Sequence, residues 1–182
     1  MNGPDWAAEN IDTNQPSAAR MYDYYLGGSH NFAADRDAAS KVLDVMPDAP
    51  LMAQANRAFL HRSVRFLVDQ GVRQFVDLGS GIPTAGNVHE VAPEATVVYV
   101  DLDPVAVAYS ESILSDVERA GIVHADVRQP EKVLESEVAR GLLDFGQPIG
   151  LLTVAVLHFV AAAEDPGGIV ATFRDALPAG SA

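Results

Sequence analysis

Cysteine is absent from this 182-residue chain, and basic residues are scarce: 12 Lys and Arg accompany 25 Asp and Glu, for a net charge of −13. The missing thiols exclude disulfides, thiolate catalysis and cysteine-ligated zinc. The acidic balance disfavours nucleic acid as a partner, because phosphate contacts require a basic surface. We therefore expect a small-molecule ligand or a basic partner, and no nucleic acid.

Long apolar runs are also missing. The longest, 149–160, is interrupted by Gly150, Thr153 and His158 and is too short to span a bilayer. The N-terminal residues lack the basic and apolar segments of a signal peptide. Hydrophobic residues nevertheless make up 48% of the chain, which is enough for one sizeable core. We expect a soluble, cytoplasmic protein that does not associate with membranes.

The predicted elements change in character near residue 70. Residues 1–70 read as a loose polar arm over 1–16 and then helices at 17–28, 35–46 and 51–70. After this, apolar runs at 74–78, 96–100, 122–125 and 149–157 alternate with helical stretches at 84–91, 104–118, 130–140 and 169–177. Such alternation predicts a parallel sheet with helices on both faces. We therefore expect an N-terminal arm and helical cap over 1–70 and an α/β core over 71–182.

The most informative segment is 75–81, Phe-Val-Asp-Leu-Gly-Ser-Gly, in which an apolar strand runs into a glycine-rich turn. The next apolar strand is followed by Asp101. Neighbouring parallel strands bring such a turn and such a carboxylate to one crevice. Gly79 and Gly81 let a ligand approach the backbone, and Asp101 can accept hydrogen bonds from a ribose. This pattern predicts a nucleoside-bearing cofactor in a Rossmann-like fold; the alternative is an ordinary turn with a capping aspartate.

The details of the turn discriminate between cofactors. A dinucleotide fingerprint would place a third glycine at position 84, which is Thr84, and Pro83 has no N–H to offer a pyrophosphate. Asp77, two residues before the first glycine, suits a cationic ligand better. S-adenosylmethionine carries a sulfonium and an ammonium and no phosphate. The pattern is therefore typical of class I methyltransferases, and an NAD-dependent oxidoreductase is the less favoured alternative.

Longer stretches of the chain resemble one family. They include Ala-Arg-Met-Tyr-Asp-Tyr-Tyr-Leu-Gly-Gly at 19–28, Ile-Pro-Thr at 82–84 and Asn-Val-His-Glu at 87–90, together with 31–36, 55–60, 77–81, 98–101, 126–128 and 155–160. Over nearly its whole length the chain resembles the S-adenosyl methyltransferase family once catalogued only as a domain of unknown function. The resemblance implies a class I methyltransferase fold with S-adenosylmethionine as cofactor, and it names no methyl acceptor.

The class I pattern assigns roles to residues of the first two strands. We expect Gly79 and Gly81 to pass close to the methionine part of the cofactor, with Asp77 near its ammonium. Asp101 would bind the ribose hydroxyls. Amide groups of a helix beginning near Thr84 would bind the carboxylate end.

By the same analogy, Leu102 could flank the adenine, Asp126 could accept its amino group and Val127 could offer a backbone contact; Asp126 could instead be a plain turn former. His158 follows the fourth strand, where class I enzymes place residues that face the transferred methyl group. It is either a general base or a core histidine, and both interpretations stay open. No metal site is expected, because His30, His61 and His124 show no metal-ligand spacing with one another.

The segment 22–31 holds three tyrosines, a glycine pair and Asn31. One interpretation is a helix that packs on the core. The other is a lid over the cofactor, in which a ring such as that of Tyr22 faces the sulfonium as a cation–π partner and Asn31 joins the pocket.

Few residues follow the last predicted helix, whereas class I methyltransferases usually continue with three more strands. With four strands, the run 149–157 would be a long apolar sheet edge, which invites pairing with another chain. We therefore expect C-terminal strands to be missing and the chain to self-associate through this edge. The functional hypotheses are a methyltransferase acting on a small molecule and, as the alternative, a non-catalytic cofactor-binding fragment.

Overall fold

The computed structural model describes residues 12–83 and 86–182, and these contain one four-stranded parallel sheet in the order β3-β2-β1-β4. The strands are β1 (Gln74–Leu78), β2 (Thr96–Asp101), β3 (Ala120–His124) and β4 (Gly150–Leu152). In this register Asp77 lies beside Tyr99 on one side and Leu152 on the other. The chain moves outward from β1 through β2 to β3 and then returns to β4, so the carboxyl end of β1 is at the topological switch point.

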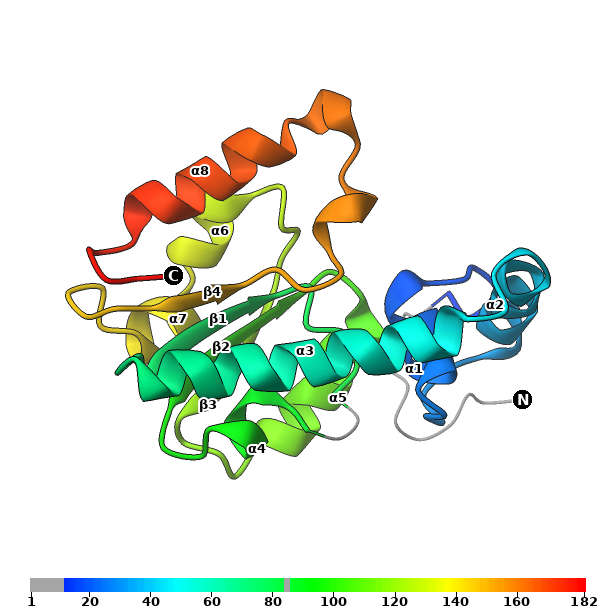
Figure 1. Cartoon of the computed structure of the whole chain (residues 1–182), viewed down its shortest axis with the longest axis horizontal. Coiled ribbons are helices and arrows are strands. Elements are labelled where there is room, and N and C mark those ends of the chain that lie inside the picture. The colour runs from blue at the N-terminus through cyan, green and yellow to red at the C-terminus, as the bar shows by residue number, and fades with distance from the viewer. Residues whose placement is uncertain (1–11, 84–85) are drawn as a thin grey trace.

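Helices cover both faces of the sheet (Figure 1). One face packs against α3 (Ala49–Asp69), α4 (Val88–Val91) and α5 (Pro104–Leu114). The other packs against α6 (Pro130–Leu134), α7 (Glu137–Leu142) and α8 (Pro166–Ala176). Side chains alternate along each strand, so Phe75 and Val97 belong to the first core and Val76 and Val98 to the second. The predicted Rossmann-like α/β fold is confirmed.

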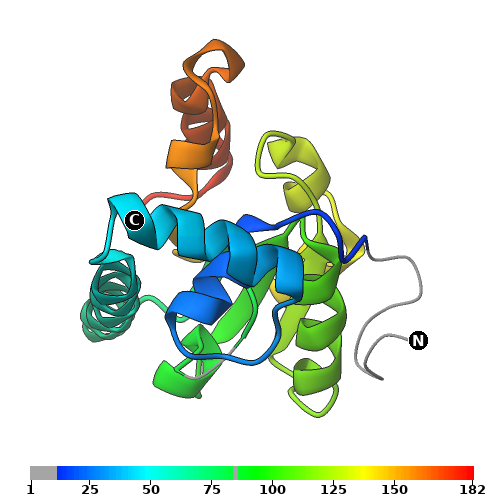
Figure 2. The ribbon, with the colours of Figure 1, turned by 90° about the vertical axis from the view of Figure 1, so that its right-hand side faces the viewer.

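Two further helices, α1 (Ala18–Tyr25) and α2 (Ala33–Val45), lie beyond the carboxyl ends of the strands and are called the cap below (Figures 1 and 2). The buried Asp35 joins them, since its carboxylate accepts the backbone N–H groups of Ser17 and Phe32. The long α3 begins beside the cap and buries Leu60 and Val64 against the sheet. The cap therefore sits over the sheet edge that carries the glycine turn, while the predicted division at residue 70 stays a prediction.

Some predicted boundaries are wrong. The run 149–157 forms a strand only over Gly150–Leu152, because Ala155 has a φ of 57° and the chain then turns into a 3₁₀ helix, η1 (Leu157–Phe159). The stretch 130–140 forms two helices, because Ser136 starts α7 by accepting the N–H of Ala139. Thr84 and most of the expected arm lie outside the described residues, and the helix expected to begin at Thr84 is described from Val88.

The outer edge of β4 differs from the expected long apolar edge. The strand has three residues, and the last residues of the chain pair with it. The N–H of Leu151 donates to the carbonyl oxygen of Ala182 at 2.7 Å, and the N–H of Ala182 donates to that of Ile149 at 3.2 Å. The hydroxyl oxygen of Ser181 accepts the N–H of Ile149 at 3.0 Å. The prediction of a long, unpaired sheet edge is therefore wrong, because β4 is short and residues 181–182 pair with it. Self-association through this edge stays a prediction.

Candidate functional site

The turn after β1 folds against the carboxyl end of β2. The N–H groups of Gly79 and Ser80 donate to the carbonyl oxygen of Val100 at 2.8 and 3.1 Å, and the N–H of Gly81 donates to Oδ2 of Asp101 at 2.7 Å. Gly79 and Gly81 have φ values of 65° and 70°, in the left-handed region that favours glycine. A Cβ on Gly79 would lie 2.4 Å from Cγ2 of Val156. The structure thus brings together Gly79, Gly81 and Asp101, as the sequence predicts.

Asp77 ends β1 as a buried carboxylate, with 6% of the residue exposed. No described residue donates a hydrogen bond to this carboxylate. Burial raises the pKa of Asp77 to about 7, while the charge of Arg57 lowers it and that of Asp101 raises it. A buried carboxylate without a donor is costly unless a cation compensates it. The position therefore suits a cationic group of a ligand.

Asp101 is equally buried but well bonded. Its Oδ2 accepts the N–H of Gly81, and its Oδ1 accepts the N–H of Asp103 at 2.8 Å. Burial raises the pKa of Asp101, and these backbone hydrogen bonds lower it. Each carboxylate oxygen can accept more than one hydrogen bond, so both remain available to ribose hydroxyls. Leu102 is 55% exposed and offers an apolar surface beside them.

Asp126, just beyond β3, is held by an arginine that the sequence did not indicate as its partner. Nε of Arg128 lies 2.9 Å from both carboxylate oxygens of Asp126, and Arg128 also pairs with Glu164. The Arg128 side-chain hydrogen bond lowers the pKa of Asp126. Val127 packs against the core on the α6–α8 face. An adenine amino group would share Asp126 with Arg128, and the adenine roles of Asp126 and Val127 stay predictions.

The predicted lid residues make contacts within the N-terminal helices. The hydroxyl of Tyr22 donates to the carbonyl oxygen of Ala53 at 2.9 Å, and partial burial raises the pKa of Tyr22. The Asn31 amide donates to Asp23 at 2.9 Å and to a backbone carbonyl, and its oxygen accepts from Arg36 at 3.0 Å. Asn31 is therefore engaged inside the cap, and the cofactor roles of Tyr22 and Asn31 stay predictions.

His158 lies in η1, on the segment that follows the Val156 contact with the glycine turn. Its side chain is exposed, and its ring centroid is 4.0 Å from that of Phe159. The interpretation as a core histidine is therefore wrong. The general-base role of His158 stays a prediction.

Arg57 of α3 is a residue of this site to which the sequence assigned no role. Burial raises the pKa values of Asp77 and Tyr22, and the positive charge of Arg57 opposes both rises, so Arg57 acts electrostatically on β1 and on the cap. The only signal was its position within the stretch 55–60 that carries the family resemblance.

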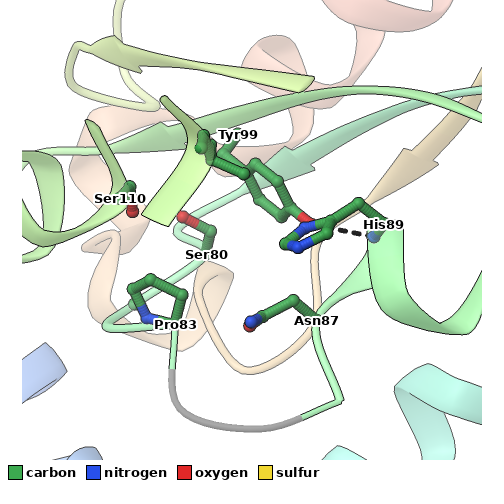
Figure 3. Close-up of a pocket in the computed structure, with 8 residues that line it drawn as sticks. Ser80, Pro83, Asn87, His89, Tyr99 and Ser110 are labelled. Carbon is green, nitrogen blue, oxygen red and sulfur yellow. Dashed lines mark hydrogen bonds between the residues drawn. The ribbon is translucent and has the colours of Figure 1, made fainter. Parts of the chain in front are cut away.

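Two hollows adjoin these residues. The smaller, of about 10 Å³, is lined by Ser80, Gly81, Pro83, Asn87, His89, Tyr99, Ser110 and Leu114 (Figure 3). It has room for about one water molecule and is too small for a cofactor. The larger is an open groove of about 660 Å³ between α3 and β4, with Phe59 and Phe66 among its lining residues.

Residues 12–83 and 86–182 contain no group of three His, Asp or Glu side chains that could hold a metal ion. Within the same residues, none of the helices combines the length and the apolar character needed to cross a membrane.

The fold and the site together define a class of protein. An acid-bearing glycine turn after β1 and a carboxylate at the end of β2, at the switch point of a parallel sheet, are typical of Rossmann-like class I methyltransferases. The chain belongs to the S-adenosyl methyltransferase family, whose sequence model matches residues 4–182.

Two solved structures that are similar to this chain support the assignment to this family. A protein from Thermobifida fusca YX, described as a candidate methyltransferase, is 39% identical, with a TM-score of 0.93 over 98% of this chain and 68% of that chain. A DUF574 family protein from Streptomyces avermitilis MA-4680 is 38% identical, with a TM-score of 0.90 over 94% of this chain and 68% of that chain. No curated protein matches the chain.

Proposed function

We propose that this chain binds S-adenosylmethionine at the carboxyl edge of β1, β2 and β3 and catalyses transfer of its methyl group to a small-molecule acceptor. The observation that carries the proposal is Asp77, a buried carboxylate with no donor among the described residues, directly before the glycine turn. The family and the relatives support methyl transfer, and neither names an acceptor.

The residues present fit this cofactor. Asp77 offers a negative charge to an ammonium group, and the space beside Gly81, where a Cβ would meet no atom within 4 Å, leaves the backbone open to close approach. Asp101 retains acceptor capacity for a ribose diol. Leu102 exposes an apolar side chain that can lie against an adenine ring.

S-adenosylmethionine, when bound, supplies a methyl group on a sulfonium, which makes it susceptible to in-line displacement. The chain then contributes alignment and exclusion of water, which together can supply much of the acceleration of such a reaction. Asp77 and Asp101 fix the two ends of the donor, and the cap covers the edge. His158 would accept the proton of a hydroxyl or ammonium acceptor, whereas an acceptor that is already nucleophilic needs no base.

Replacement of Asp101 tests this proposal. Titration calorimetry with S-adenosylhomocysteine should show affinity at least about tenfold lower for Asp101→Ala, because charge-assisted hydrogen bonds contribute ~1.5–3 kcal/mol each. Asp101→Asn, which keeps the shape and loses the charge, should fall between this variant and the wild type. Asp116→Asn, a change at an exposed acid after α5, is the control and should leave affinity unchanged.

The same titration with NAD should give no binding. Tighter binding of NAD than of S-adenosylhomocysteine, or an affinity for S-adenosylhomocysteine that Asp101→Ala leaves unchanged, would contradict the proposal.

A further inference from the structure

One stripe of α3 faces the cap and the loop that follows the glycine turn. The carbonyl oxygen of Ala53 accepts the hydroxyl of Tyr22 at 2.9 Å. Farther along the helix, Nε2 of His61 lies 2.6 Å from the carbonyl oxygen of Gly86. Arg57 is four residues from both Ala53 and His61 and therefore lies on the same face of the helix, between these two contacts.

Asp77 faces α3 from the sheet. Side chains alternate along a strand, so Asp77 points to the same face of β1 as Phe75. Phe75 is fully buried in a single core with Leu60 and Val64 of α3. The carboxylate of Asp77 is therefore directed toward the helix that carries Arg57.

The charge of Arg57 acts on several groups in this region. Burial raises the pKa values of Asp77, of Tyr22 in the cap and of Tyr99, the direct neighbour of Asp77 in β2, and the charge of Arg57 opposes each rise. Yet neither Arg57 nor the Asp77 carboxylate forms an ion pair or a side-chain hydrogen bond with any described residue. An arginine that served only to neutralise Asp77 would be expected to contact it bidentately. Among the described residues, the two opposite charges instead stay beyond ion-pair distance, and each keeps hydrogen-bonding capacity for a ligand.

We propose that Arg57 and Asp77 together form the subsite for the amino-acid end of the cofactor, in which the Arg57 guanidinium binds the α-carboxylate and Asp77 binds the α-ammonium. The inference rests on the proposed function. An α-amino acid carries both charges on one carbon, which matches a cation on α3 opposite an anion on β1. The planar fork of arginine also suits a carboxylate better than a point charge does. Arg57 thereby takes a role that the sequence assigned to the helix beginning near Thr84.

Three ligands separate the two charges. S-adenosylhomocysteine carries both, its decarboxylated analogue keeps only the ammonium, and 5′-methylthioadenosine has neither. Dissociation constants are measured by calorimetry for the wild type and for Arg57→Gln, Arg57→Lys and Asp77→Asn. Arg65→Gln, at an exposed arginine of the same helix, is the matched control. Thermal denaturation confirms that each variant is folded.

Arg57→Gln should weaken binding of S-adenosylhomocysteine roughly tenfold or more, and should not weaken binding of the other two ligands. Arg57→Lys should restore part of the loss, because it keeps the charge without the fork. Asp77→Asn should weaken both ammonium-bearing ligands and leave 5′-methylthioadenosine unchanged. Arg65→Gln should change none of the three.

Other results overturn the inference. If Arg57→Gln leaves S-adenosylhomocysteine binding unchanged, or weakens all three ligands equally, Arg57 does not hold the carboxylate, while the proposed function stands. If the wild-type chain binds none of the three ligands, the proposed function fails and this inference fails with it.

Discussion

Nε of Arg20 lies 3.5 Å from Oδ2 of Asp103, in an ion pair that is almost fully buried. The same atom lies 3.4 Å from Asp35 of α2, while the N–H of Asp103 donates to the carboxylate of Asp101. Continuous contacts therefore link the cap to the residue proposed to hold the ribose. Arg20 is thus the cation that the buried carboxylates of Asp35 in the cap and Asp103 beside the site share.

Removal of that arginine should be costly. Arg20→Leu leaves Asp35 and Asp103 buried without their counter-ion, and we expect it to lower the free energy of unfolding by ~3–5 kcal/mol. Chemical denaturation measures this change. Arg174→Gln, which breaks an exposed ion pair with Asp175, is the control and should stay within ~0.5 kcal/mol of the wild type. If the two substitutions lowered the free energy of unfolding equally, the buried ion pairs of Arg20 would not stabilise the fold as we expect.

Asp77 should make the free protein less stable as the pH rises. Its pKa is raised from 3.8 to about 7 on folding, so the folded state holds the proton more tightly than the unfolded chain. Its contribution to stability is full below about pH 4 and is lost as the pH rises through about 7. At about pH 8 Asp77→Asn should therefore be more stable than the wild type, by ~1–3 kcal/mol, and the difference should shrink at about pH 5. Denaturation curves in which the two proteins differ equally at both pH values would contradict this assignment.

Cofactor binding should have the opposite pH dependence. An ammonium favours the ionised form of Asp77, so binding below about pH 7 must release a proton. The dissociation constant for S-adenosylhomocysteine should therefore rise as the pH falls from about 8 to about 6, by at most about tenfold per unit. Calorimetry should find this dependence in the wild type and a nearly flat profile in Asp77→Asn. The same pH dependence of the dissociation constant in both proteins would show that Asp77 does not bind the ammonium group of the ligand.

Self-association is best tested at the groove between α3 and β4. Phe66 lines this groove and is 62% exposed, so it is a suitable apolar contact for a second chain. We expect the wild type to associate at tens of micromolar and Phe66→Glu to be monomeric, as measured by light scattering. Phe159→Glu, at a similarly exposed ring in η1, should behave as the wild type does. If the wild type is a monomer at tens of micromolar, the prediction of self-association is wrong.

The features that could be predicted from the sequence are those encoded locally. The turn at Gly79 and Gly81 and the strand end at Asp101 follow from residue type and spacing, and parallel strands place them together without further information. The start of α5, expected at residue 104, follows in the same way, because Asp103 accepts the N–H of Val105.

The features that the sequence did not reveal depend on distant partners or on backbone strain. Arg57 reaches Asp77 only because α3 packs across the sheet, and Arg128 meets Glu164 from a segment far along the chain. The end of β4 was misplaced because an apolar run does not distinguish a strand from a turn; β4 ends at Leu152, before the turn that contains the left-handed Ala155.

A crystal structure of the chain with S-adenosylhomocysteine tests the central claim most directly. We expect the amino-acid end of the ligand between Asp77 and Arg57, the ribose hydroxyls on Asp101 and the homocysteine part of the ligand against the turn at Gly79 and Gly81. Ligand density elsewhere, such as in the groove between α3 and β4, with Asp77 and Asp101 free of contact, would contradict it.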